Sequence, residues 1–251
     1  MLFRTIFLSV ALTFALSANA KVSKEESYTF EISDGGTLSV SNVNGSIRVT
    51  GGGGSTIEVK ATKSAENQKT LDKIEIKISQ SKDSVEIETD LPDSSRWLNW
   101  GGDSGSVSYE ITVPSGIKLD SIDTVNGQVE IRGVSGDVHA ESVNGELELE
   151  GLAGDAQLET VNGSISASFA KLEGQQKVKA STVNGRITLR LPKDADVEVN
   201  ADTLNGGINA RDFDLETEKG YVGSDLNGKI GAGSARLNLD TVNGSIKIRK
   251  D

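Results

Sequence analysis

Few residues in this sequence have the types and spacing that enzyme chemistry requires. The chain of 251 residues contains one histidine, His139, and no cysteine. A Cys–His pair is therefore impossible, and a Ser–His–Asp triad would have to use His139, although no serine lies in the context of a strained nucleophile turn. Alternation along its own segment places His139 on an outward-facing position. We therefore interpret His139 as a surface residue and predict no catalytic residue.

Carboxylates are plentiful, and their spacing pairs several of them. Glu141 and Glu159 are 18 residues apart, as are Glu130 and Glu148. Stacked carboxylates repel one another unless they are solvated or share a cation such as calcium, a hard ion that takes oxygen ligands. We favour a solvated acidic face and predict no metal site. The alternatives are a cation-stabilised structural protein and a carbohydrate-active enzyme, which needs two carboxylates roughly 5 to 9 Å apart in a cleft.

Aromatic side chains, which sugar-binding clefts usually present, are scarce in this chain. Both tryptophans, Trp97 and Trp100, lie in one glycine-flanked loop. Packing under the loop, or covering an open end of the fold, would explain them structurally. An exposed aromatic patch for a sugar or protein partner would explain them functionally. If the chain has a binding site, the sequence places it in this loop, and no cofactor is predicted.

One five-residue unit recurs eight times, far more often than chance allows: an aliphatic residue, Asn, Gly, a non-aliphatic residue and an aliphatic residue. From the second copy onward, successive copies are 18, 18, 22, 21, 22 and 16 residues apart. Such self-similarity at a nearly fixed period is typical of repeat architectures. We interpret the Asn-Gly pairs as structural corners at Asn44, Gly45, Asn126, Gly127, Asn144, Gly145, Asn162, Gly163, Asn184, Gly185, Asn205, Gly206, Asn227, Gly228, Asn243 and Gly244.

Two architectures fit units that hold two short strands and two corners. One is an antiparallel meander, since Asn-Gly is the favoured two-residue hairpin turn. The other is a solenoid of stacked coils. The residue before Asn is always Val or Leu, whereas the residue after Gly is never apolar. In a two-residue hairpin these flanks would pair on one face, so their opposite character favours a corner that bends around a core, with the aliphatic flank facing inward.

The predicted fold class is therefore all-β: a β-solenoid (β-helix-like) of about 18–22-residue coils with an irregular antiparallel N-terminal part. In such a stack identical Asn side chains lie above one another, and their amides can bond along the ladder. Glycine is expected to supply a positive φ where the chain bends.

The N-terminus predicts export. Residues 1–20 combine Arg4, an apolar stretch and a small-x-small cleavage site, a combination typical of a secretory signal peptide. Residues 21–251 are predicted to form a single elongated β-repeat domain. Within it, residues 62–106 form an insertion with a short helix, a hairpin and the tryptophan loop, and residues 107–251 carry the regular repeats.

Charge and composition limit the cellular locations and the classes of partner that the sequence predicts. The apolar N-terminal stretch is too short for a comfortable membrane span, so no stable membrane insertion is expected after signal cleavage. The formal net charge of −11 repels nucleic acid, which is therefore not a predicted partner. The absence of cysteine excludes a disulfide framework and a lipid anchor on an N-terminal cysteine. We predict an exported protein, periplasmic or extracellular.

Two stretches carry a resemblance to a known family. Residues 109–114 are followed by the run of Val-Asn-Gly and Gly-Asp units, and residues 38–47 show the same type of sequence. Over nearly all of the mature chain this pattern resembles a bacterial putative adhesin family of unknown function. The resemblance implies a β-solenoid-like envelope or secreted protein without accepted catalytic residues. We therefore expect a non-enzymatic, adhesin-like binding or scaffolding role, with a surface glycan or an envelope protein as the candidate partner.

Overall fold

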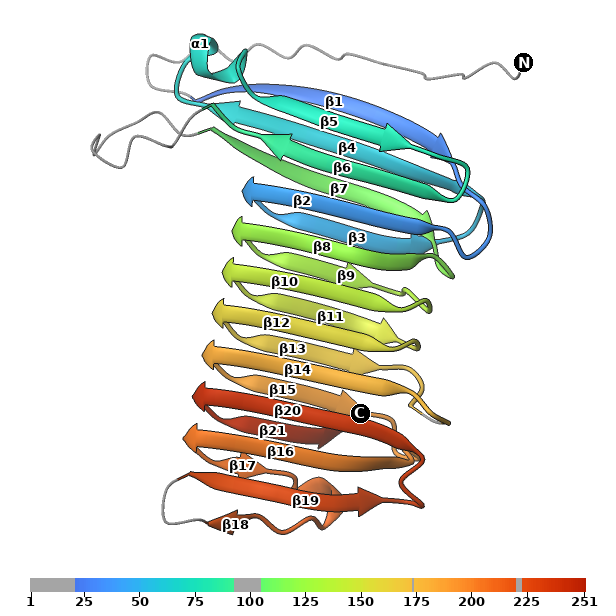
Figure 1. Ribbon diagram of the computed structural model, residues 1–251, viewed down its shortest axis with the longest axis vertical. Coiled ribbons are helices and arrows are strands. Elements are labelled where there is room, and N and C mark those ends of the chain that lie inside the picture. Colours follow the sequence, from blue (N-terminus) through green and yellow to red (C-terminus); the bar gives the residue numbers. More distant parts are fainter. Residues whose placement is uncertain (1–20, 93–104, 173, 220–222) are drawn as a thin grey trace.

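The computed structural model describes residues 21–92, 105–172, 174–219 and 223–251. The predicted signal peptide and the loop with Trp97 and Trp100 lie outside the described residues. The described chain forms two sheets, of ten and eleven strands, that run side by side along an elongated stack (Figure 1). We call the sheet that contains β1 the first sheet and the sheet that contains β2 the second sheet. No helix in the described part of the chain is long and apolar enough to cross a bilayer.

Each regular coil has one strand in the second sheet and one in the first, joined by an Asn-Gly corner. Neighbouring coils pair in parallel and in register, so that Leu147 pairs with both Val129 and Ile165. This confirms the solenoid and excludes a meander, whose strands would pair antiparallel. Four consecutive coils are β8 (Lys118–Asn126) with β9 (Val129–Arg132), β10 (Val138–Asn144) with β11 (Leu147–Leu152), β12 (Ala156–Asn162) with β13 (Ile165–Phe169), and β14 (Lys177–Asn184) with β15 (Ile187–Leu191).

Alternation along the strands builds a core that runs through the stack between the two sheets. In β11, Leu147 and Leu149 are buried, whereas Glu148 and Glu150, which alternate with them, are not. The in-register stacking places each of these aliphatic side chains against its equivalents in the neighbouring coils. Glu141 also pairs with Glu159, as predicted, because one repeat of 18 residues makes up one coil.

The spatial order of the coils departs from the chain order at the C-terminal end. The last two strands, β20 (Ala235–Asn243) and β21 (Ile246–Lys250), lie between the coil of β14 and β15 and the coil of β16 (Val197–Asn205) and β17 (Ile208–Asn209) (Figure 1). β20 pairs in parallel with both β14 and β16. The last coil of the chain therefore lies between two coils that come before it in the sequence.

The N-terminal part has the same kind of insertion and carries the antiparallel strands. β2 (Thr37–Asn44) and β3 (Ile47–Gly52) lie between later strands: β2 between β6 and β8, and β3 between β7 and β9. Antiparallel pairing joins β1 to β4, β4 to β7 and β5 to β6. The remaining elements of this part are β1 (Val22–Glu31), β4 (Thr56–Ala65), α1 (Gln68–Leu71), β5 (Glu75–Gln80), β6 (Ser84–Asp90) and β7 (Ser106–Pro114).

The far end of the stack corrects one predicted corner. Asn227 and Gly228 lie inside β19 (Ser224–Ile230), where they pair with Asn200 and Val199 of β16. β19 runs antiparallel to β16 and continues straight through the Asn-Gly pair, so this copy of the motif forms no corner. The short elements η1 (Arg211–Phe213) and β18 (Glu218–Lys219) precede β19.

Candidate functional site

The other seven predicted Asn-Gly pairs lie at the ends of second-sheet strands, where the chain crosses to the first sheet. The asparagine amides stack into a hydrogen-bonded ladder. Asn144 Nδ2 donates to Asn126 Oδ1 at 2.9 Å, and Asn162 Nδ2 donates to Asn144 Oδ1 at 3.0 Å. The ladder follows the spatial order of the coils, because Asn243 donates to Asn184, and Asn205 donates to Asn243. These asparagines are explained by the architecture.

Glycine is required at these corners for a reason other than the predicted positive φ. Among the corner glycines only Gly45, with a φ of 120°, has a positive φ. A Cβ on Gly163 would lie 1.8 Å from the carbonyl oxygen of Gly145 in the neighbouring coil, and a Cβ on Gly145 would lie 1.8 Å from that of Gly127. The corners approach so closely that only a residue without a side chain fits.

A hydroxyl group two residues before six of the seven corner asparagines binds the neighbouring corner, and Asn42 takes this position before Asn44. Thr160 Oγ1 donates to the carbonyl oxygen of Gly145 at 3.0 Å, and Thr182 Oγ1 donates to that of Gly163 at 2.9 Å. Both threonines are buried. Our sequence interpretation missed this position, although its signal was present as a recurring Thr or Ser at the period of the repeat: Thr124, Ser142, Thr160, Thr182, Thr203 and Thr241.

Replacing Thr160 with valine is expected to lower the free energy of unfolding by about 1–3 kcal/mol, because it leaves the Gly145 carbonyl without its hydroxyl donor. Urea unfolding measures this change. Thr188→Val, on the outer face of the first sheet, is the control and should change the free energy of unfolding by less than about 0.5 kcal/mol. Equal effects of the two substitutions would show that the hydroxyl bond does not stabilise the corner.

Val43, before Asn44, is partly buried, but at the other six corners the aliphatic residue before the asparagine is exposed, which corrects the predicted inward orientation. The alternation of the strand continues up to the corner, so the buried position belongs to the threonine and the next residue faces outward. These side chains keep between 39% and 51% of their surface exposed. They lie on six adjacent strands of the second sheet and form what we call the aliphatic row: Val125, Val143, Val161, Val183, Val242 and Leu204.

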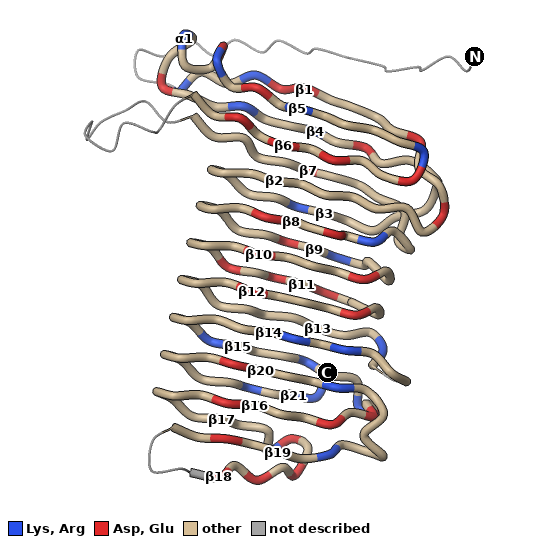
Figure 2. Tube along the Cα trace, viewed as in Figure 1, with Lys and Arg blue, Asp and Glu red and all other residues tan. Residues whose placement is uncertain are grey.

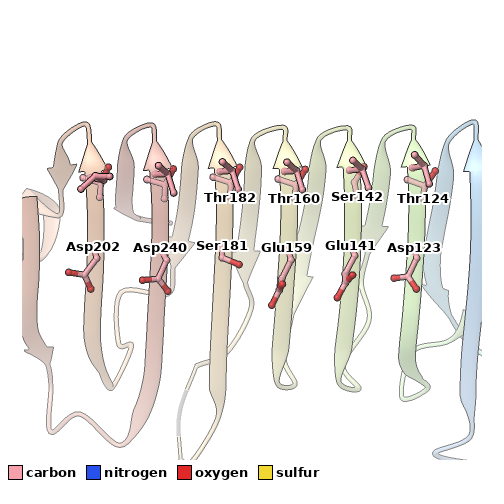
Figure 3. A pocket seen from close by; sticks show the side chains of 18 of the residues that line it. Asp123, Thr124, Glu141, Ser142, Glu159, Thr160, Ser181, Thr182, Asp202 and Asp240 are labelled. Carbon is pink, nitrogen blue, oxygen red and sulfur yellow. The ribbon is translucent and has the colours of Figure 1, made fainter. Parts of the chain in front are cut away.

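A line of carboxylates runs beside the aliphatic row. Residues two positions apart in a strand share a face, so the side chains two residues before the aliphatic row point outward with it (Figure 3). Ser181 interrupts the line on β14. Asp225 on β19 pairs with Asp202 and extends the line by one strand. We call the carboxylates the acidic row, and its members, in their order along the sheet, are Asp123, Glu141, Glu159, Asp240, Asp202 and Asp225.

The two rows line one groove with a volume of about 850 Å³ on the outer face of the second sheet. The acidic row contributes six carboxylates to its lining, and the described lining residues include no lysine, arginine or histidine. Acidic residues recur along the second-sheet strands in this region (Figure 2). The groove therefore combines an apolar side and an anionic side that both run along the stack.

The environment of the acidic row raises the pKa of two of its carboxyl groups. Burial raises the pKa of Asp123, and the charge of Glu141 adds to this, while a hydrogen bond from Ser121 acts in the opposite direction. Burial also raises the pKa of Asp240, and the charge of Asp202 on the next strand adds to it. The ionised forms of these two carboxyl groups therefore destabilise the folded state.

Other members of the row have partners beside the groove. The ammonium group of Lys179 lies 2.7 Å from Glu159 Oε1, and this hydrogen bond lowers the pKa of Glu159. His139 Nε2 lies 2.8 Å from Glu141 Oε1 on the same strand. The single histidine is thus partly exposed and engaged with a carboxylate of the row, and the described residues hold no group of His, Cys, Asp and Glu arranged as metal ligands.

Replacing Asp240 with asparagine is expected to raise the melting temperature at pH 7. Because folding raises the pKa of Asp240 above its ordinary value, this carboxyl group favours the folded state only while it is protonated, and it destabilises the fold as the pH rises through that pKa. The increase in melting temperature that Asp240→Asn causes should therefore become smaller toward pH 3. Thermal unfolding at pH 7 and pH 3 measures it, and an unchanged or lower melting temperature at pH 7 would contradict the strain that we ascribe to the row.

Two acceptor oxygens at one end of the groove have no hydrogen-bond donor among the described residues, namely Asn42 Oδ1 and Asp123 Oδ1. Asn42 keeps only 3% of its surface exposed, and its amide nitrogen donates to the carbonyl oxygen of Val107 at 2.8 Å. The two residues lie on the adjacent strands β2 and β8, and both line the groove. This end of the groove is therefore rich in acceptors and lacks donors for them.

The fold is that of a two-sheet β-solenoid. The sequence matches the family model described as Toastrack DUF4097 over residues 13–249, and the chain belongs to this family. No curated protein matches the sequence.

Solved structures that match this chain come from several bacteria. A putative cell adhesion protein from Clostridium sporogenes is 18% identical, with 92% of this chain and 100% of that chain covered and a TM-score of 0.49. A putative adhesin from Bacteroides fragilis is 12% identical, with 90% and 97% covered and a TM-score of 0.36. A putative adhesin from Parabacteroides distasonis is 9% identical, with 93% and 98% covered and a TM-score of 0.27.

Proposed function

We propose that this protein is an exported, non-enzymatic, adhesin-like protein of the cell envelope that binds its partner along the groove of the second sheet. The aliphatic row carries this proposal, because its six side chains are exposed on six adjacent strands while the aliphatic residues of the core are buried. Soluble proteins rarely expose a continuous apolar patch unless it contacts a partner. A stack of similar coils repeats the same contact at each step, which suits an elongated partner.

The arrangement of the carboxylates favours binding over hydrolysis. The two carboxylates of a glycosidase flank the bond that they cleave. Those of the acidic row instead lie in one line on one face of one sheet (Figure 3). The carbohydrate-active alternative therefore receives less support from the geometry than a binding surface does.

Retention on envelope material tests this proposal. We would immobilise peptidoglycan, surface glycans and envelope protein extract, and compare the exported protein with Val143→Thr/Val161→Thr. The double substitution keeps side-chain size and removes apolar contact, so retention should fall about tenfold, which corresponds to roughly 0.7 kcal/mol for each side chain. Thr188→Val is the control for a change of similar size on the first sheet. Retention of the double variant equal to that of the wild type would contradict the proposal.

The tryptophan loop is the competing site in the same experiment. Trp97→Ala/Trp100→Ala is tested beside the groove variant because the sequence predicts a binding patch at these residues. If only the tryptophan variant loses retention, the binding surface is the loop and the groove proposal is wrong. If only the groove variant loses it, the tryptophans are structural.

A further inference from the structure

The chemistry of the groove limits what can occupy it. An occupant that contacts both rows needs an apolar stripe and a cationic stripe side by side, because the carboxylates and the aliphatic side chains lie two residues apart on the same face. Cationic groups are the complement of six carboxylates in a lining without a basic residue. Such an occupant would also relieve the repulsion between Asp240 and Asp202, which the positive charge of Lys179 offsets only in part.

A second observation points to an occupant that donates hydrogen bonds. Of the two unpartnered oxygens at the β2–β8 end of the groove, that of Asp123 belongs to the outward-facing acidic row, whereas Asn42 pairs with Thr124 and occupies the buried position. Buried acceptors without a donor are costly, and nearly all such groups in native proteins have a partner. Ammonium and guanidinium groups supply several donors and a positive charge together. The same side chains that neutralise the acidic row would therefore also supply a donor to the carboxylate of Asp123.

The spacing of the rows distinguishes between two forms of polypeptide. Side chains on one side of an extended chain recur roughly every 6.7 Å, so they fall out of step with rows whose members lie roughly 4.8 Å apart. A helix carries neighbouring stripes along its length, and its pitch of about 5.4 Å is close to the roughly 4.8 Å between strands. The aliphatic row crosses six strands, a length of roughly 24 Å, which corresponds to about 16 helical residues.

We propose that the groove of the second sheet binds a basic amphipathic helix of a partner protein, with its aliphatic stripe on the aliphatic row and its Lys and Arg side chains on the acidic row. This inference rests on the proposed function and gives the chemical class of the partner. Helices that lay an apolar face into a groove are a recurrent mode of recognition. Here the acidic row would select among amphipathic helices by charge.

A synthetic peptide tests the inference directly. The probe is an 18-residue peptide of Leu and Lys with Leu at helical spacing, labelled for fluorescence anisotropy. A scrambled peptide of the same composition and a Leu–Glu peptide of the same pattern are the controls for shape and charge. Vesicles of anionic and of zwitterionic phospholipid test whether a lipid surface is the true occupant. The exported protein should bind the Leu–Lys peptide, more weakly as the salt concentration rises.

Matched variants of the protein locate the binding. Asp202→Asn/Asp240→Asn should weaken binding of the Leu–Lys peptide about fivefold or more, through the loss of two charge contacts. Val143→Thr/Val161→Thr should weaken it about tenfold. Glu148→Gln/Glu150→Gln removes the same number of charges from the outer face of the first sheet and should change the affinity less than about twofold. Because Asp240→Asn is expected to stabilise the fold, a loss of binding there cannot be ascribed to unfolding.

The remaining outcomes overturn the inference in distinguishable ways. Equal binding of the Leu–Glu or scrambled peptide, or equal losses in the first-sheet control, would show that the acidic row selects nothing. Groove-dependent binding of vesicles without peptide binding would make a lipid surface the occupant. If no peptide or vesicle binds but envelope retention still depends on Val143 and Val161, this inference is wrong and the proposed function stands. If retention does not depend on them either, both are wrong.

Discussion

Replacing Gly163 with alanine is expected to lower the free energy of unfolding by about 3 kcal/mol or more, the upper end of the cost of overpacking. The added Cβ would lie 1.8 Å from the carbonyl oxygen of Gly145 and 2.6 Å from its carbon. Both atoms belong to the backbone of a coil that further coils hold in place, so the corner cannot yield without breaking hydrogen bonds of the ladder. Urea unfolding of the variant measures the loss.

A glycine elsewhere gives the control for this substitution. A Cβ on Gly116 would meet no atom within 4 Å, so Gly116→Ala should change the free energy of unfolding by less than about 1 kcal/mol. If Gly163→Ala were as mild as Gly116→Ala, close approach between coils would not be the reason for glycine at the corners.

Deleting residues 235–251 is expected to unfold the end of the solenoid that contains β16 and β19. These residues form β20 and β21, which hydrogen-bond the coil of β14 and β15 on one side and β16 and β17 on the other. Without them β16 and β19 lose their connection to the rest of the second sheet. In a stack in which each coil contacts only its neighbours, the damage stays local.

Hydrogen exchange resolves this prediction along the chain. Amides of β16 and β19 should lose their protection in the truncated protein, while those of β8 to β13 keep it. Protection of β16 at its wild-type level would mean that β16 pairs directly with β14 once β20 is absent, and would contradict an essential role for the inserted coil.

The period of the repeat was enough to predict the coils and their register. In a parallel, in-register stack the residue that lies above another is one repeat away, so Glu141 over Glu159 and the asparagine ladder follow from counting. The position of β20 between β14 and β16 does not follow from counting. The copies of the repeat share the same Asn-Gly sequence and the same alternation, so no local feature of the sequence indicates which copies are neighbours in space.

The site was predicted less well than the fold, for a physical reason at each residue. Val161 was assigned inward because an aliphatic side chain is cheapest when buried, but the buried position belongs to Thr160, whose hydroxyl group binds the neighbouring corner. Gly163 was explained by φ, although contact between coils requires it. Of the acidic row only the pair Glu141 and Glu159 was predicted, and it was interpreted as part of a solvated face, because a sequence does not show the groove that the row lines.

The sequence predicts the binding site in the tryptophan loop, whereas the structure leads us to propose it on the second sheet. Trp97 and Trp100 remain a prediction of the sequence. The groove adds a surface in which apolar exposure, carboxylate repulsion and unpartnered acceptors coincide. Natural proteins tolerate such destabilising arrangements chiefly where they serve binding or catalysis.

The claim that partners bind along this groove is tested most directly by methyl NMR. The valine and leucine methyl signals of the protein would be followed while the Leu–Lys peptide, or a partner retained from envelope material, is added. We expect the signals of Val143, Val161, Val183 and Leu204 to shift together at one affinity, while those of Leu147 and Leu149 in the core stay nearly constant. Binding that leaves the four exposed side chains unperturbed would contradict the account.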